Sequence, residues 1–182
     1  SKRLPLSREV RSKISGEFPY YGPTGLLDSI NEFRYQGKFA LIGEDGDHFL
    51  KADIFSQTQL VEGRFNVNNH AHVVCGKTSM TDWFFHYFRH RDIVPHLTRQ
   101  GANRYKLRKS TLEVLPVAIP PKIEEQKAIA GALSNLDGLI AGLEALIAKK
   151  RNLKTATMQQ LLTGKTRLPG FGEGVGMKQT EI

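Results

Sequence analysis

The stretch PPKIEEQKAIAGAL, residues 120–133, decides how this chain is organised. It opens with two prolines, which cannot continue a helix from the preceding residues. A pair of glutamates follows, and negative charge is favourable at the positive end of a helix dipole. Apolar residues then recur at helical spacing. The stretch therefore predicts that a helix starts at Ile123 and that the chain changes character there.

Downstream of this start, the apolar residues repeat every 3.5 positions on average, which is the heptad spacing of a helix that packs along another helix. The heptad seam consists of Ile129, Leu133, Leu136, Ile140, Leu143 and Ile147. Apolar residues continue to Leu162, and Gly164 is a plausible stop signal. The pattern predicts a helix over residues 123–162, about 60 Å long at roughly 1.5 Å per residue.

A helix of this length cannot bury its apolar stripe against a domain of about 118 residues, which is roughly 30 Å across. We therefore expect a second long helix to cover the stripe, from another copy of the chain or another part of a longer parent protein. The alternatives are a helix that folds back over its own domain and a helix broken at Gly138 or Gly142. Small residues such as Gly131 and Ala145 favour close helix–helix approach.

The fold class predicted upstream of the helix is α+β. Short apolar runs that end in turn residues predict strands within 38–46 and 64–76. The segment 81–97 predicts a helix capped by Asp82, with its phenylalanines in the core rather than on a base-stacking platform. The segment 24–33 fits either a short helix or a pair of strands.

The sequence divides into three parts. Residues 1–118 are predicted to form a globular domain, and residues 119–165 contain the long helix. Residues 166–182 are rich in glycine and poor in core residues, so we expect a flexible tail there.

The composition is basic, with 26 Lys and Arg residues against 18 Asp and Glu residues and a formal net charge of +8. The basic residues are concentrated between Arg89 and Lys109, where Asp92 is the one acidic residue. This basic stretch is either a solvated surface or a surface that follows the phosphates of a nucleic acid.

The remaining features bound the function. Cys75 is the single cysteine, so no internal disulfide can form, and we expect a reducing compartment and a cytoplasmic location. No uninterrupted apolar run approaches the roughly 18 residues that span a bilayer, so no membrane partner is expected. No nucleophile–base constellation, cofactor-binding loop or zinc-ligand spacing is present, so we expect no catalysis, no cofactor and no metal.

A family resemblance extends over nearly the whole chain. The stretch LPVAIPPKIEEQKAIAGAL and its continuation to RLPGF, residues 115–171, resembles the conserved helical region of the specificity subunit of type I restriction–modification enzymes. FPYYGPTGLLD (18–28), ALIGEDG (40–46) and LTRQGANRYKLRKS (97–110) look like parts of that family's target recognition domains.

The resemblance implies a non-catalytic subunit that recognises double-stranded DNA. In that family each recognition domain reads one half of a bipartite site, and the long helices pair antiparallel and set the distance between the half-sites. The helices also dock methyltransferase subunits and, through them, the restriction subunit. Because one repeat is present instead of two, the chain resembles a half-subunit, a fragment or a rearranged form, and we expect a homodimer that associates through the helix.

Two loops contain candidate DNA-binding residues, because polar and planar side chains read base edges and basic side chains contact phosphates. The candidates are Tyr20, Tyr21, Gly22, Thr24, Arg99, Gln100, Asn103, Arg104 and Lys106. Among them, Arg104 or Gln100 is the expected base reader and Lys106 the expected phosphate contact. The competing hypothesis is a coiled-coil oligomerisation module whose basic head binds protein and reads no DNA sequence.

Overall fold

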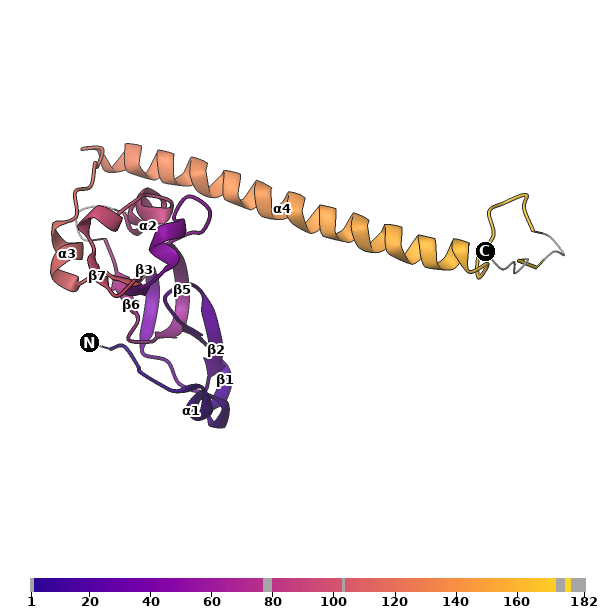
Figure 1. Ribbon diagram of the computed structural model, residues 1–182. Helices are drawn as coiled ribbons and strands as arrows, with labels where there is room; N and C mark the ends of the chain where they lie inside the picture. The colour runs from indigo at the N-terminus through magenta and orange to yellow at the C-terminus, as the bar shows by residue number, and fades with distance from the viewer. Residues whose placement is uncertain (1, 77–79, 103, 173–175, 178–182) are drawn as a thin grey trace. The chain divides into compact units, whose positions relative to one another are not determined.

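The computed structural model describes residues 2–76, 80–102, 104–172 and 176–177. Contacts divide the chain into two compact units, Ser1–Leu133 and Ser134–Ile182. The elements are α1 (Arg8–Lys13), β1 (Ser15–Tyr21), β2 (Leu26–Ile30), β3 (Tyr35–Gly43), β4 (Asp45–Gly46), the 3₁₀ turn η1 (His48–Lys51), β5 (Thr58–Val67), β6 (Ala71–Val74), α2 (Thr81–Arg89), the 3₁₀ turn η2 (Val94–His96), β7 (Thr98–Gln100), β8 (Arg104–Lys106), α3 (Lys109–Val114) and α4 (Ile123–Leu162). The predicted α+β class is confirmed (Figure 1).

Two sheets form the first unit. The larger has five strands in the order β2-β1-β5-β3-β6, and the smaller has three in the order β4-β8-β7. Only the β1–β5 pair is parallel among these described pairings. The undecided segment 24–33 contains the strand β2, which lies antiparallel to β1.

Two glycines face each other in the long β3–β5 ribbon. Gly37 lies directly opposite Gly63, and their φ angles of 128° and 95° fall in the region that favours glycine. The rings of Tyr35 and Phe39 lie 5.8 Å apart, although residues four apart on a straight strand are separated by about 13 Å. The ring of Phe65 contacts both. The ring of Phe39 lies over Gly37, and the three aromatic rings therefore cluster beside the glycine pair.

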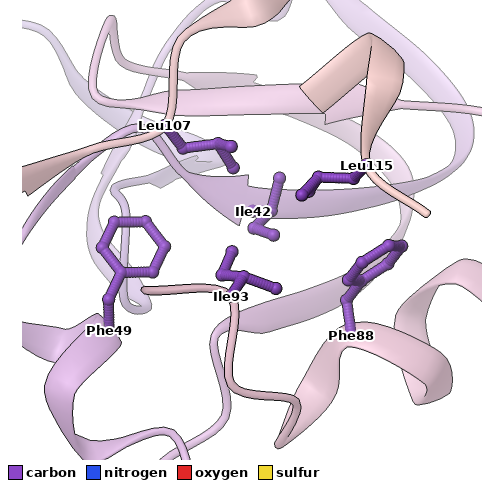
Figure 2. Close-up of a cluster of buried hydrophobic side chains, with 6 residues drawn as sticks. All are labelled: Ile42, Phe49, Phe88, Ile93, Leu107 and Leu115. Carbon is purple, nitrogen blue, oxygen red and sulfur yellow. The ribbon is translucent and has the colours of Figure 1, made fainter. Parts of the chain in front are cut away.

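A second apolar cluster joins the small sheet to the helices (Figure 2). It is formed by Ile42, Phe49, Phe88, Ile93, Leu107 and Leu115. Phe84 packs against this cluster, so the expectation that the α2 aromatics are core residues is confirmed for Phe84 and Phe88. Leu107, directly after β8, is fully buried and thereby anchors the small sheet to the domain.

The segment 81–97 differs from the prediction in two respects. The helix α2 ends at Arg89, and the chain around Pro95 forms the separate turn η2. Asp82 does not cap the helix, because the N-cap residue is Met80 and no side chain caps it. The carboxylate of Asp82 is instead paired with the ammonium group of Lys38 on β3.

The predicted long helix is confirmed. The helix α4 runs from Ile123 to Leu162, 40 residues without a break at Gly138 or Gly142. Gly164 follows with a φ of 73°, as expected of a residue that terminates a helix. All six seam side chains are exposed: Ile129 (37%), Leu133 (40%), Leu136 (55%), Ile140 (54%), Leu143 (50%) and Ile147 (51%).

The helix α4 also meets the length and composition of a membrane span, because one 18-residue window has a mean hydropathy of 1.3. This window admits isolated charges, so it does not test the prediction that no uninterrupted apolar run approaches roughly 18 residues. Length and composition do not separate a membrane helix from the exposed seam of a coiled coil. Asp137 and Glu144 interrupt the apolar residues at positions where the heptad pattern continues, which is typical of a coiled coil.

Candidate nucleic-acid interface

The register of the small sheet sorts the predicted residues onto its two faces. In an antiparallel pair, residues directly opposite one another project from the same face. Gln100 pairs with Arg104, and Lys106 pairs with Thr98 on one side and Asp45 on the other. Because positions alternate along β8, Arg104 and Lys106 share a face. Gln100, Arg104 and Lys106 therefore lie together on one surface, which we call the outer face.

The opposite face of the small sheet points toward the core. Tyr105 of β8 packs against the apolar cluster of Figure 2, and its cross-strand partner is Arg99. The guanidinium of Arg99 donates hydrogen bonds of 3.0 Å to the carbonyl oxygens of Gly101 and Ala102. Arg99 thus braces the β7–β8 turn from the side away from the outer face.

The residues of the outer face differ in exposure. Gln100 is exposed, and the side chain of Arg104 is 69% exposed, which leaves both accessible to a ligand. The side chain of Lys106 is 30% exposed, and its ammonium lies 3.3 Å from a carboxylate oxygen of Glu44. Asn103, the remaining candidate in this loop, lies outside the described residues.

An acidic pair borders the basic strand. The carboxylate of Glu44 lies between Arg3 and Lys106, with His72 also nearby. Burial raises the pKa of this carboxyl, but the hydrogen bond from Arg3 and the neighbouring positive charges outweigh burial and hold the pKa below its usual value. Glu44 is therefore ionised at neutral pH and partly neutralises Lys106.

The neighbouring carboxylate, Asp45, is on the strand β4. It accepts a hydrogen bond from Nδ1 of His70 at 2.9 Å and lies 3.9 Å from the guanidinium of Arg104. His70 belongs to an Asx turn, because its backbone N–H donates to the side chain of Asn68 at 2.9 Å. The turn at 68–70 thus supports the outer face through Asp45.

Hydrogen bonds hold the small sheet to the domain at Leu107. Its backbone N–H donates to the carbonyl oxygen of Glu44 at 2.7 Å. Its carbonyl oxygen lies 2.7 Å from Nε2 of His72, so this nitrogen carries the proton and donates. Because both backbone groups and the buried side chain of Leu107 are engaged, the end of β8 is fixed in place.

The loop after β1 contributes less than predicted. Tyr20 is fully buried, and its hydroxyl donates to the carbonyl oxygen of Leu4 at 2.5 Å. Its ring belongs to a core cluster with Leu4 and Ile30, so the assignment of Tyr20 to a DNA-binding surface is corrected. Tyr21 is half-buried with its ring edge-on to Phe65, and it presents little free surface.

Gly22 is buried. A Cβ at this position would lie 2.7 Å from Cδ1 of Leu27, whose side chain is exposed and could move aside. Thr24 is exposed. The carbonyl oxygen of Pro23 lies against Gly43, the last residue of β3 and one residue before Glu44. Thr24 is the residue of this loop that remains available for a ligand.

The acidic border of this surface was not predicted from the sequence. The segment GEDGDHF, 43–49, fits a local hairpin turn, yet Asp45 and Gly46 form a strand that pairs with β8 about sixty positions later. A pairing over this separation leaves no local signal in the pattern of apolar residues. The available signal was the pair of adjacent acids, since acidic residues are favourable opposite basic residues of a neighbouring strand.

The comparison with family models decides the membership. Residues 2–150 match the model of the type I restriction modification DNA specificity domain. The chain belongs to this family. The specificity domain is similar to a Haemophilus influenzae protein named as a type I restriction enzyme specificity subunit, with 36% identity over 138 residues, or 75% of this chain and 34% of the relative. Membership places the chain with the DNA-specificity components, which are not the catalytic ones.

Two further proteins are similar to this specificity domain. A Methanocaldococcus jannaschii protein named as the MjaX specificity subunit is 28% identical over 100 residues, covering 55% of this chain and 22% of the relative. The crystal structure of a type I restriction–modification S subunit from M. genitalium matches with a TM-score of 0.62 and 17% identity, over 88% of this chain and 42% of that one. At this identity the match concerns the fold. The chain spans about a third of the length of the H. influenzae relative.

Proposed function

We propose that the chain recognises one half of a bipartite double-stranded DNA site and that the outer face of the small sheet is its reading surface. The observation that carries this proposal is the cross-strand arrangement of Gln100, Arg104 and Lys106 on one exposed face, with Arg99 turned away. A two-stranded ribbon of this kind fits the major groove of B-DNA.

The three side chains suit different parts of the DNA. Arg104 can donate two hydrogen bonds to the O6 and N7 atoms of guanine, and Gln100 can pair with adenine through its amide. Lys106 is held against Glu44 and is assigned to a phosphate, where a single positive charge is sufficient. Thr24, on the neighbouring loop, adds a hydroxyl at the border of this surface.

The helix α4 is proposed to pair antiparallel with a second long helix, from another copy or a second repeat. Charge polarity supports this orientation. Residues 123–144 contain the acids Glu124, Glu125, Asp137 and Glu144 with one lysine, and residues 145–162 contain Lys149, Lys150, Arg151 and Lys154 with no acid. Antiparallel pairing brings opposite charges together along the helices, whereas parallel pairing aligns like charges.

The remaining parts of the proposal come from the relatives. They are named as subunits of restriction enzymes, so we propose that the helix docks methyltransferase subunits and, through them, a restriction subunit in the cytoplasm. In this assembly the helix length would set the spacing of the two half-sites. No cofactor and no membrane partner are included in the proposal.

DNA binding by the complex with methyltransferase subunits tests the reading surface. A target selected from random DNA should bind the wild-type complex more tightly than scrambled DNA, and affinity should fall steeply as salt rises. Replacing Gln100, Arg104 and Lys106 together by alanine should remove the sequence preference. Binding that shows no preference and little salt dependence would instead support the alternative, an oligomerisation module with a protein-binding head.

A further inference from the structure

A buried glutamine joins the start of the long helix to the recognition domain. Gln126 is 3% exposed, although it belongs to the first turns of α4, where most side chains face solvent. Its amide oxygen accepts a hydrogen bond of 3.2 Å from the backbone N–H of Met80. Its amide nitrogen donates a hydrogen bond of 2.8 Å to the carbonyl oxygen of Pro120. One side chain thus bridges the residue that begins α2 and the segment that enters α4.

The surface around this bridge is narrow. Ala130, one turn further along the same side of the helix, is 2% exposed, and Gln126 and Ala130 are the two buried residues among the described positions of α4. Because Gln126 and Ala130 lie on the same side of the first turns of α4, a loss of the two hydrogen bonds of Gln126 acts on the direction of these turns.

The segment before the helix is also attached to α2. Nε1 of Trp83 donates to the carbonyl oxygen of Ala118 at 3.1 Å, and the hydroxyl of Tyr87 accepts from the N–H of Ala118 at 3.1 Å. These bonds fix the chain before Pro120 but leave the helix itself free to turn about the prolines. Among these hydrogen bonds, the one between Gln126 and Met80 joins a residue beyond the prolines to the domain, so it ties the first turns of α4 to α2.

We infer that Gln126 is a positioning residue that fixes the direction in which α4 starts from the recognition domain, and that it thereby contributes to discrimination of half-site spacing. This inference rests on the proposed function for its second half, since spacing has meaning only if two half-sites are read. The first half concerns contacts within the unit Ser1–Leu133 and is testable without DNA.

Spin-label distances test the positioning directly. Cys75 is the single cysteine and is exposed, and Ala132 is exposed on the third turn of α4, so the native cysteine and Ala132→Cys provide a label pair within one compact unit. An excess of unlabelled chain suppresses distances between copies. We expect a narrow distance distribution, which Gln126→Ala broadens. Gln126→Met, which keeps the length of the side chain without its hydrogen bonds, serves if the alanine variant does not fold.

Gln159→Ala is the matched control, because Gln159 is an exposed glutamine on the same helix and its replacement should leave the distribution narrow. The same variants, in complex with methyltransferase subunits, are then assayed for methylation of the selected target with its spacer lengthened or shortened by one base pair. Gln126→Ala should lower the preference for the correct spacer about fivefold, the effect expected of a lost buried hydrogen bond, with unchanged preference for the half-site sequence.

Each result has a distinct meaning. Equally narrow distributions in the Gln126 and Gln159 variants would overturn the positioning role. A broadened distribution with an unchanged spacer preference would overturn the role in spacing. A wild-type complex that methylates targets of all spacer lengths equally would refute the proposed role of the helix in setting half-site spacing. The spin-label distances would still test whether Gln126 positions the helix.

Discussion

The recognition domain and the long helix differ in the burial of their apolar side chains. In the domain, Leu41 and Ile42 on β3 are completely buried among side chains of other elements. On α4, Leu136 and Leu139 are 55% and 59% exposed. The domain completes its own core, whereas the helix presents a regular apolar stripe that nothing in the described chain covers. The difference indicates that the domain folds by itself and that the helix is an interface.

The largest expected effect concerns the helix. Replacing Leu136 and Leu143 by aspartate should convert the associated chain into a monomer, because each charge in a buried seam costs several kcal/mol. Sedimentation equilibrium measures the mass. The recognition domain should keep its melting temperature, since neither residue belongs to its core. An unchanged mass of the double variant would show that the seam is not the interface.

A core substitution should produce the reverse pattern. Replacing Ile42 by alanine should lower the free energy of unfolding of the domain by about 2–5 kcal/mol, since it removes buried methyl groups and leaves a cavity. Denaturant titration followed by the fluorescence of Trp83 measures this loss. The mass at a given concentration should not change under native conditions. Dissociation of the assembly by this variant would mean that the two regions are not independent.

The next effect separates the two faces of the small sheet. Arg104→Ala should weaken binding to the cognate site by about 1–3 kcal/mol and binding to scrambled DNA much less, as expected for a contact to a base edge. Arg99→Lys is the matched control, because Arg99 occupies the opposite face and a lysine keeps a donor for the turn carbonyls, so sequence preference should stay intact. Equal effects of the two variants would contradict the assignment of faces.

The smallest effect concerns the pH dependence of the domain. Burial lowers the pKa of His48, whose Nε2 is buried without a hydrogen-bond partner. The pKa of His48 in the folded domain lies below its unfolded value of 6.5, so the stabilising contribution of this residue is fully present above pH 6.5. The contribution is lost as the pH falls from 6.5 through the folded pKa, because the unfolded chain binds the proton more readily. His48→Phe should therefore flatten the stability profile between about pH 7 and 5. A profile identical to that of the wild type would assign the pH dependence to other groups.

The same comparison explains which features could be predicted from sequence. The helix α4 was predicted with its observed ends, because a heptad repeat, a proline-led start and a terminal glycine are local signals. The sequence named Gln100, Arg104 and Lys106 as candidates together with Arg99, but it did not predict that the register of the β7–β8 pair places Arg99 on the opposite face.

The errors arose where the structure depends on distant segments. Tyr20 is buried because the N-terminal segment around Leu4 covers it, and neither its neighbours nor its residue type indicates this. The pairing of Asp45 with Lys106 joins positions about sixty residues apart, so the acidic border of the reading surface has no local pattern. The carboxylate of Asp82 pairs with Lys38, which is distant in sequence. The predicted N-cap of α2 by Asp82 therefore does not form.

Hydrogen exchange over a dilution series tests the contrast between the two regions most directly. The amides of β3 in the recognition domain should keep the same protection at every concentration, since their core lies within one chain. The amides of residues 134–162 should be protected at high concentration and exchange rapidly on dilution, because a long helix with an exposed apolar stripe is marginal without its partner. Strong protection of residues 134–162 at the lowest concentration, in a chain that sediments as a monomer, would contradict the account.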